Sequence, residues 1–179
     1  MVPAPSGLAF VQDFLNTRAR AGRTDDLLGT VRDAQTWADG AVDAWSGETG
    51  ANARGPRLRA ADLPRLRALR DATVELLGGN GEGVGDVALV ARVDSTGRVV
   101  LEPAGSGAEV LAGILAIEVF RAQEGDVWRR LKTCRKETCP VAFYDRSPNN
   151  AGAWHDVRVC GNAVNLRASR ARRRAATQE

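Results

Sequence analysis

The residues best suited to chemistry in this chain are its 3 cysteines and its single histidine. Cys134 and Cys139 have four residues between them, and His155 and Cys160 are again separated by four. Two close pairs of thiolate or imidazole donors, joined by a longer loop, are typical of a structural zinc site. The spacing therefore predicts one tetrahedral Zn²⁺ held by Cys134, Cys139, His155 and Cys160, with no open position for a water ligand.

Other interpretations of these residues stay open at this point. Cys134 and Cys139 could form a disulfide, although an odd number of cysteines and the absence of a secretion signal weigh against it. A lone histidine is more often an ordinary surface or core residue than a ligand. The position of His155 shortly before Cys160 favours the ligand role.

The residues between the two donor pairs predict the elements that position them. Residues 140–144 read as a short strand, and residues 147–150 read as a turn rich in proline and asparagine. Trp154 is expected to form an apolar lid beside the histidine. From Val157 the pattern becomes helical, which places Cys160 in or near the first turn of a helix.

This segment resembles the CGNR zinc finger, a C-terminal module of bacterial proteins. The residues that match its pattern are Cys134, Cys139, Phe143, Asp145, Arg146, Ser147, Asn149, Trp154, Cys160, Gly161 and Asn162. His155 stands where the family has its third cysteine, and zinc accepts either donor. Ala163 stands where the family has its name-giving arginine. Near the N-terminus, residues 10–17 resemble the opening of the family's upstream domain, which is described as a stress-induced transcription regulator.

Charge is distributed unevenly along the chain. Residues 1–127 carry a net charge of −5, whereas residues 128–179 carry 12 basic and 4 acidic side chains. A basic surface of this kind is typical of proteins that contact nucleic acid phosphates. The expected DNA contacts are Arg146, Arg158, Arg167, Arg170 and Arg173. The alternative is a solvated C-terminus whose arginines partly reflect genomic base composition.

The 179 residues, 44% of them apolar, are enough for one ordinary domain and a small appendage. We expect an α+β fold with two units. Residues 1–126 form a mostly helical regulatory or ligand-sensing domain with a β-hairpin at 87–102, and residues 127–179 form the zinc finger and its basic helix. No membrane-spanning run or export signal is apparent, so a cytoplasmic location is expected.

Hydrophobic spacing and capping residues predict the helices of the larger unit. The first is capped by Ser6 and ends at Asn16, and the second is capped by Thr30 and ends near Trp45. Trp37 and Trp45 are expected in the core, because large aromatic side chains line pockets less often.

Two further helices follow the second. The third begins at Asp62, ends at Gly78, and carries a leucine stripe toward the core. Its charged side chains are expected to face water, namely Arg65, Arg67, Arg70 and Asp71. The fourth opens at Ser106, ends at Gly125 and is almost wholly apolar, so it should be a widely buried central element.

These features together predict a DNA-binding transcription regulator that responds to stress or to a small-molecule effector. A homodimer on two half-sites is expected, because a single finger offers modest contact area. The alternatives are a protein-interaction, small-ligand-binding or RNA-binding module with a purely structural zinc finger. Catalysis is not expected, because the histidine and the cysteines are committed to the metal and no acid pair or nucleophilic serine stands out.

Overall fold

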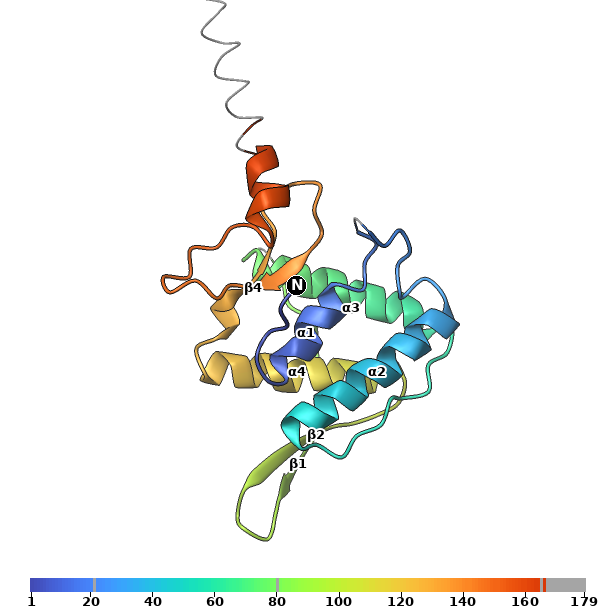
Figure 1. Cartoon of the computed structure of the whole chain (residues 1–179). Helices are drawn as coiled ribbons and strands as arrows, with labels where there is room; N and C mark the ends of the chain where they lie inside the picture. The colour runs from blue at the N-terminus through green and yellow to red at the C-terminus, as the bar shows by residue number, and fades with distance from the viewer. Residues whose placement is uncertain (21, 80, 165, 167–179) are drawn as a thin grey trace, which may run out of the picture.

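Helix α1 (Leu8–Leu15) lies at the centre of the fold, and helices α2 (Val31–Thr49), α3 (Asp62–Leu77) and α4 (Ala108–Glu124) each contact it (Figure 1). The computed structural model describes residues 1–20, 22–79, 81–164 and 166. Within this part of the chain, these helices and two small antiparallel sheets form an α+β fold, as predicted. α1 is short but almost entirely buried, since Leu8, Val11, Phe14 and Leu15 all belong to the core.

The first helix begins differently from the prediction. Ser6 has a positive φ of 50° and no side chain caps α1, whose N-cap residue is Gly7. Close packing favours Gly7 there, because a Cβ atom on it would lie 2.1 Å from Oε2 of Glu118 on α4 and would push that carboxylate aside. The predicted end of the helix at Asn16 is confirmed.

The second helix has the predicted start and a later end. Thr30 is the N-cap of α2, and its Oγ1 accepts a hydrogen bond from the backbone N–H of Asp33 at 3.2 Å. The helix continues past Trp45 and ends at Gly50, whose φ of 70° is the left-handed conformation that glycine adopts most readily. Trp37 and Trp45 are both buried in the core.

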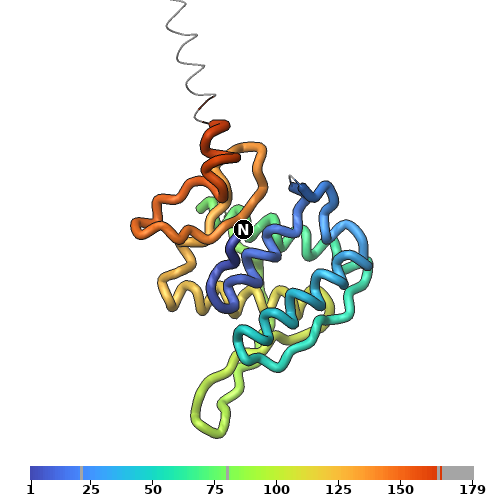
Figure 2. Tube along the Cα trace, in the orientation of Figure 1, coloured from blue at the N-terminus to red at the C-terminus, as the bar shows by residue number. Residues whose placement is uncertain are grey.

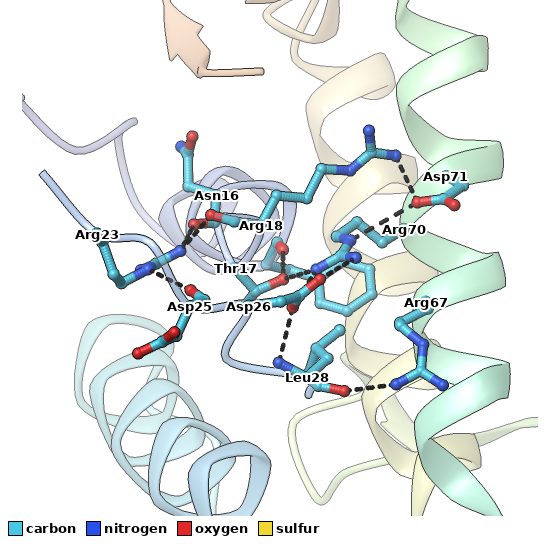
Figure 3. Close-up of polar contacts among 11 residues, drawn as sticks. Asn16, Thr17, Arg18, Arg23, Asp25, Asp26, Leu28, Arg67, Arg70 and Asp71 are labelled. Atoms are coloured by element: carbon cyan, nitrogen blue, oxygen red, sulfur yellow. Dashed lines mark hydrogen bonds and ion pairs between the residues drawn. The ribbon is translucent and has the colours of Figure 1, made fainter. Parts of the chain in front are cut away.

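On α3, the prediction that Arg70 faces water is wrong. Its side chain is only 4% exposed and its two terminal nitrogens donate to the carboxylate of Asp26 at 2.8 and 2.7 Å (Figure 3). One of these nitrogens also donates to Oγ1 of Thr17 at 2.9 Å. The loop between α1 and α2 therefore supplies a carboxylate that lets an arginine enter the interior. Arg65 and Asp71 are exposed as expected.

Helix α4 is the widely buried element that its composition predicts, and its N-cap is Gly107. The hairpin of β1 (Leu89–Val93) and β2 (Val99–Pro103) confirms the predicted hairpin and packs on this helix. Gly113 of α4 permits the approach, because a Cβ atom on it would lie 2.6 Å from Cβ of Pro103. No helix of the described residues has the length and apolar character needed to cross a bilayer.

The C-terminal segment lies at the end of the molecule opposite the hairpin (Figures 1 and 2). It consists of the short 3₁₀ turn η1 (Trp128–Arg130), strands β3 (Leu131–Thr133) and β4 (Ala142–Tyr144), and the π-helical turn η2 (Val157–Gly161). β3 and β4 pair antiparallel. Only the strand at 140–144 was predicted from the sequence, and its partner β3 was not.

Strand β4 is joined to the helical part by Asn16. The Asn16 amide donates to the backbone carbonyl of Ala142 at 2.8 Å and accepts from its backbone N–H at 3.0 Å. Leu131 and Ala142 belong to the same hydrophobic core as α1. The division into units at residue 126 stays a prediction, and buried packing crosses that boundary.

Candidate metal centre

The four predicted ligands converge on one point of the C-terminal segment. The ligand atoms of Cys134, Cys139, His155 and Cys160 all lie within 4.8 Å of one another. Nδ1 of His155 lies 3.4 Å from Sγ of Cys139 and 3.6 Å from Sγ of Cys160. A tetrahedral zinc ion with its usual bond lengths places neighbouring donor atoms about 3.4–3.8 Å apart. The three cysteines are free thiols, so the alternative disulfide is absent.

The first pair of ligands is positioned by the β3–β4 hairpin. Cys134 directly follows β3, and its backbone N–H donates to the carbonyl of Val141 at 2.9 Å. The chain then turns, and the N–H of Cys139 donates to the carbonyl of Lys136 at 2.8 Å. The hairpin therefore fixes Cys134 and the turn fixes Cys139, and their sulfurs lie within 4.8 Å of each other.

The second pair is positioned by Asp156, which caps η2. Its carboxylate accepts from the backbone N–H groups of Arg158 and Val159 at 2.8 and 3.1 Å. Its carbonyl accepts from the N–H of Cys160 at 2.9 Å. Single π-helical turns occur frequently at functional sites. The helical pattern predicted from Val157 is confirmed over the described residues, with Cys160 inside the first turn.

The electrostatics of the cluster suit a bound cation. Burial and the neighbouring Cys134 and Cys139 sulfurs raise the pKa of the Cys160 thiol to about 12. Burial, together with the positive charges of Arg20 and Lys136, lowers the pKa of His155, which favours the neutral imidazole that binds metal. Three thiolates in such a cluster repel one another unless a cation is bound. The donor set therefore fits one structural zinc ion and leaves no protein ligand unused.

Asp145 organises the loop between the ligand pairs. This carboxylate is 3% exposed, receives the ammonium of Lys132 at 2.7 Å, and accepts from the N–H groups of Ser147 and Gly152 at 2.9 and 2.6 Å. Burial alone would raise the pKa of Asp145, but these hydrogen bonds hold it well below its usual range. Residues 145–152 are thereby fixed around the ion pair of Lys132 and Asp145, which explains why residue 145 is acidic.

Trp154 packs on the turn that carries Cys160. A Cβ atom on Gly161 would lie 2.7 Å from Cδ1 of the indole, so only glycine leaves room for this contact. Trp154 is therefore a lid over η2, and its predicted place beside the histidine stays a prediction.

Substitution of Gly161 by alanine is expected to weaken this contact. The added methyl group must displace the indole, which typically destabilises a packed site by about 1–3 kcal/mol. Competition with a chelator should show faster zinc release from the Gly161→Ala protein. Gly47→Ala is the control, because a Cβ atom there meets nothing within 4 Å. Equal release rates for both variants would contradict the packing role of Gly161.

The predicted DNA-contacting arginines have different positions. Arg158 lies in η2 and is exposed. Arg146 is also exposed, but one of its terminal nitrogens donates to the carbonyl of Pro3 at 2.6 Å and its guanidinium lies over the Tyr144 ring, 5.5 Å from the centroid. The remaining three predictions, Arg167, Arg170 and Arg173, lie outside the described residues.

Three further basic residues near the metal ligands were not predicted as contacts. Arg20 and Lys136 line a small pocket of about 250 Å³ together with Cys139 and His155, and Arg135 directly follows Cys134. The charged residues between the first two ligands could have been found from the sequence, since side chains next to inward-pointing ligands tend to face outward. The position of Arg20 could not be predicted in this way, because it is far from the metal ligands in the sequence and lies beside them only in the folded structure.

Comparison with known protein families identifies the C-terminal segment. Residues 130–173 match the family described as the CGNR zinc finger. The match includes all four metal ligands and begins within η1, just before β3. No curated protein matches the chain.

Proposed function

We propose that this chain, whose C-terminal segment is a CGNR zinc finger, is a DNA-binding transcription regulator in which that finger contacts the nucleic acid. The observation that carries the proposal is a group of unpaired basic side chains beside the metal ligands. The zinc has a structural role, because a closed shell of three sulfurs and one imidazole leaves no position for a substrate. By fixing the hairpin and η2, it would hold these basic groups in a defined arrangement.

Several basic residues near the metal have no carboxylate partner, whereas others in the fold do. Arg70, Arg121 and Arg129 are each paired with a carboxylate. Among the residues that the structure describes, Arg135 and Arg158 have no carboxylate within ion-pair distance and are exposed. Arg20 and Lys136 are also without an ion-pair partner there. Cations without a carboxylate partner are free to contact a polyanion.

The C-terminal arginines extend this positive charge. Arg167, Arg170 and Arg173 follow η2 in the sequence, so their charges continue the basic segment beyond the described residues. Arg146 is a weaker DNA contact in this proposal, because its guanidinium already donates a hydrogen bond to the Pro3 carbonyl. We further propose that the helical part binds a small-molecule effector and that two copies of the chain bind two half-sites.

Binding to duplex DNA is expected to depend strongly on salt. If the zinc-loaded protein neutralises about five phosphates, the logarithm of the association constant should fall with the logarithm of salt concentration at a slope of about −4 to −5. Fluorescence anisotropy with a labelled random duplex measures this slope.

A matched pair of arginine variants tests the location of the interface. Arg158→Gln should reduce the slope by about 0.9, the share of one phosphate contact. Arg98→Gln is the control, because Arg98 is an exposed arginine beside β2, at the opposite end of the molecule. Binding that is absent or insensitive to salt would favour a protein-interaction module. Tighter binding to single-stranded RNA than to duplex DNA would favour the RNA-binding alternative.

A further inference from the structure

We infer that a basic pocket between the α1–α2 loop and the turn that carries Cys139 binds a phosphate group. The pocket has a volume of about 250 Å³. Its charged lining residues are Arg20 and Arg23 of the helical part and Lys136 of the zinc finger, and Thr138 adds a hydroxyl group. Among the described residues, no aspartate or glutamate lines this pocket. Cations and a hydroxyl group around a small space are donors that suit the oxygens of a phosphate group.

The two arginines are held at the pocket by the backbone of their own loop. Arg20 and Arg23 exchange two backbone hydrogen bonds, of 2.7 and 2.9 Å, and Gly22 between them has a φ of 86°, which favours glycine. Nη2 of Arg23 also donates to the carbonyls of Asn16 and Arg18 at 2.5 and 2.6 Å (Figure 3). The loop therefore places both arginines beside the finger before any ligand is bound.

The donors that line the pocket are free and accessible. In the described part of the chain, the side chains of Arg20 and Lys136 have no carboxylate within ion-pair distance. Nη1 of Arg23 is also unused, since Nε and Nη2 are the nitrogens that bind backbone carbonyls. None of these donors is among the fully buried polar atoms that lack a partner. An anion in the pocket could therefore accept hydrogen bonds from these side chains.

The cations around the pocket repel one another. Burial and the nearby charge of Arg20 lower the pKa of Arg23, as expected for two guanidinium groups held close together. The carboxylates of Asp13 and Asp26 oppose this shift, but Asp26 already binds Arg70. Repulsion between like charges is relieved when an anion binds among them. The pocket therefore gains from a bound phosphate group in a way that a neutral ligand would not provide.

The zinc centre offsets only part of this positive charge. Zn²⁺ with three thiolates and a neutral imidazole carries one net negative charge, and two of its ligands, Cys139 and His155, line the pocket. One of the three cations therefore balances the metal centre, and two remain for a bound group. A phosphate diester carries one negative charge and a monoester nearly two, so either can be accommodated.

The pocket lies beside the surface that is proposed to contact DNA. Val159 of η2 lines it, and the exposed Arg158 is the preceding residue. A backbone phosphate of the duplex is therefore the expected source of the group, and Arg20 brings the helical part into the interface. This last step rests on the proposed function, whereas binding of a phosphate group does not.

Titration with inorganic phosphate tests the pocket without DNA. In the zinc-loaded full chain, the backbone amide signals of Gly22 and Thr138 should shift with phosphate and reach saturation, unlike with chloride at equal ionic strength. Arg20→Gln should weaken this binding about tenfold, as loss of a hydrogen bond to a charged group typically does. Arg98→Gln is the matched control and should leave the binding unchanged, because Arg98 lies beside β2 at the opposite end of the molecule.

Three results of this titration would overturn the inference. They are the absence of saturation in the wild-type chain, equal weakening by the two variants, and unchanged phosphate binding in an Arg20→Gln protein that has lost its zinc. The last result would show that Arg20 serves the thiolates of the metal centre and not a bound anion. Elemental analysis of both variants measures the zinc.

Titration with duplex DNA tests the source of the phosphate group. Arg20→Gln should reduce the salt slope of duplex binding by about 0.9, the share of one phosphate contact. If inorganic phosphate binds but this slope is unchanged, the pocket takes free phosphate or a small phosphorylated molecule, and its assignment to the DNA backbone is overturned. Failure of the wild-type chain to bind DNA would refute the proposed function, while the phosphate titration would still decide whether the pocket binds phosphate.

Discussion

Replacement of Cys160 by serine is expected to release the zinc and to unfold the end of the finger. Cys160 is buried, and its sulfur lies 3.6 Å from the ligand nitrogen of His155. A hydroxyl group is a poor substitute for a thiolate at zinc, and structural zinc contributes about 10 kcal/mol or more to the folding of small modules. Without it, η2 has few apolar contacts, because Val157 and Val159 are exposed.

The helical part should remain folded in the same variant. Its core contains Phe14, Leu15, Leu111 and Ile114, none of which lies in the finger. Calorimetry should therefore separate a metal-dependent transition from a later one, and elemental analysis should show loss of the zinc. The amide signal of Ala142, which Asn16 holds, reports how far the unfolding extends.

The matched control is His155→Cys, which introduces the residue that the CGNR pattern has at this position. Nδ1 of His155 lies 3.4 Å from Sγ of Cys139, within the range for two ligands of one zinc ion. The variant should retain one zinc per chain, because a thiolate can replace the imidazole. A metal-free Cys160→Ser protein with an ordered η2 would contradict the structural role of the metal.

The metal site could be predicted from the sequence because its ligands, and the turns that hold them, lie close together in the sequence. The two donor pairs lie within a single segment, and each pair is held by a short turn whose residues follow ordinary capping and hairpin rules. The fold around it could be predicted less well. β3 has only three residues and no alternating pattern, so its pairing with β4 depends on the hairpin that the metal closes.

Contacts between distant segments gave no sequence signal. Asn16 was correctly predicted as the end of a helix. Its hydrogen bonds to Ala142 could not be predicted, because the two residues are 126 positions apart in the sequence. Arg146 matched a family pattern, while its bond to the Pro3 carbonyl required the N-terminal segment to lie beside β4. Side chains of this kind acquire their roles only when the tertiary structure brings a partner.

The buried position of Arg70 could not be predicted from the sequence either. Loss of its ion-pair partner, Asp26, is the second change with a large expected effect. A charged residue beside Arg67 and Asp71 on a helix is expected to face water, yet Arg70 is buried against Asp26. Asp26→Asn is expected to destabilise the protein by about 3 kcal/mol, because it removes the carboxylate that binds both terminal nitrogens of a buried guanidinium and leaves only the more distant Asp71 at 3.7 Å. Chemical denaturation monitored by circular dichroism measures the change in the free energy of unfolding.

Asp126→Asn is the control for this change. It removes the partner of Arg129 from a pair whose side chains are 57% and 77% exposed, so the expected loss is below about 1 kcal/mol. Asparagine also tolerates the positive φ of 52° at this residue. Both variants should retain zinc. Equal destabilisation by the two substitutions would show that burial of Arg70 adds nothing to the strength of its pair.

The pH dependence of the Asp26 variant gives an independent check. Burial alone would raise the pKa of Asp26, but hydrogen bonds from Arg70 and from the N–H of Leu28 lower it below its ordinary value. A carboxylate with a lowered folded-state pKa contributes stability above its unfolded pKa of about 3.9, and this contribution is lost as the pH falls through the folded value. The difference between wild type and Asp26→Asn should therefore be constant near neutral pH and shrink in acid. A difference that persists below the folded pKa would mean that the substitution acts through packing and not through the charge on Asp26.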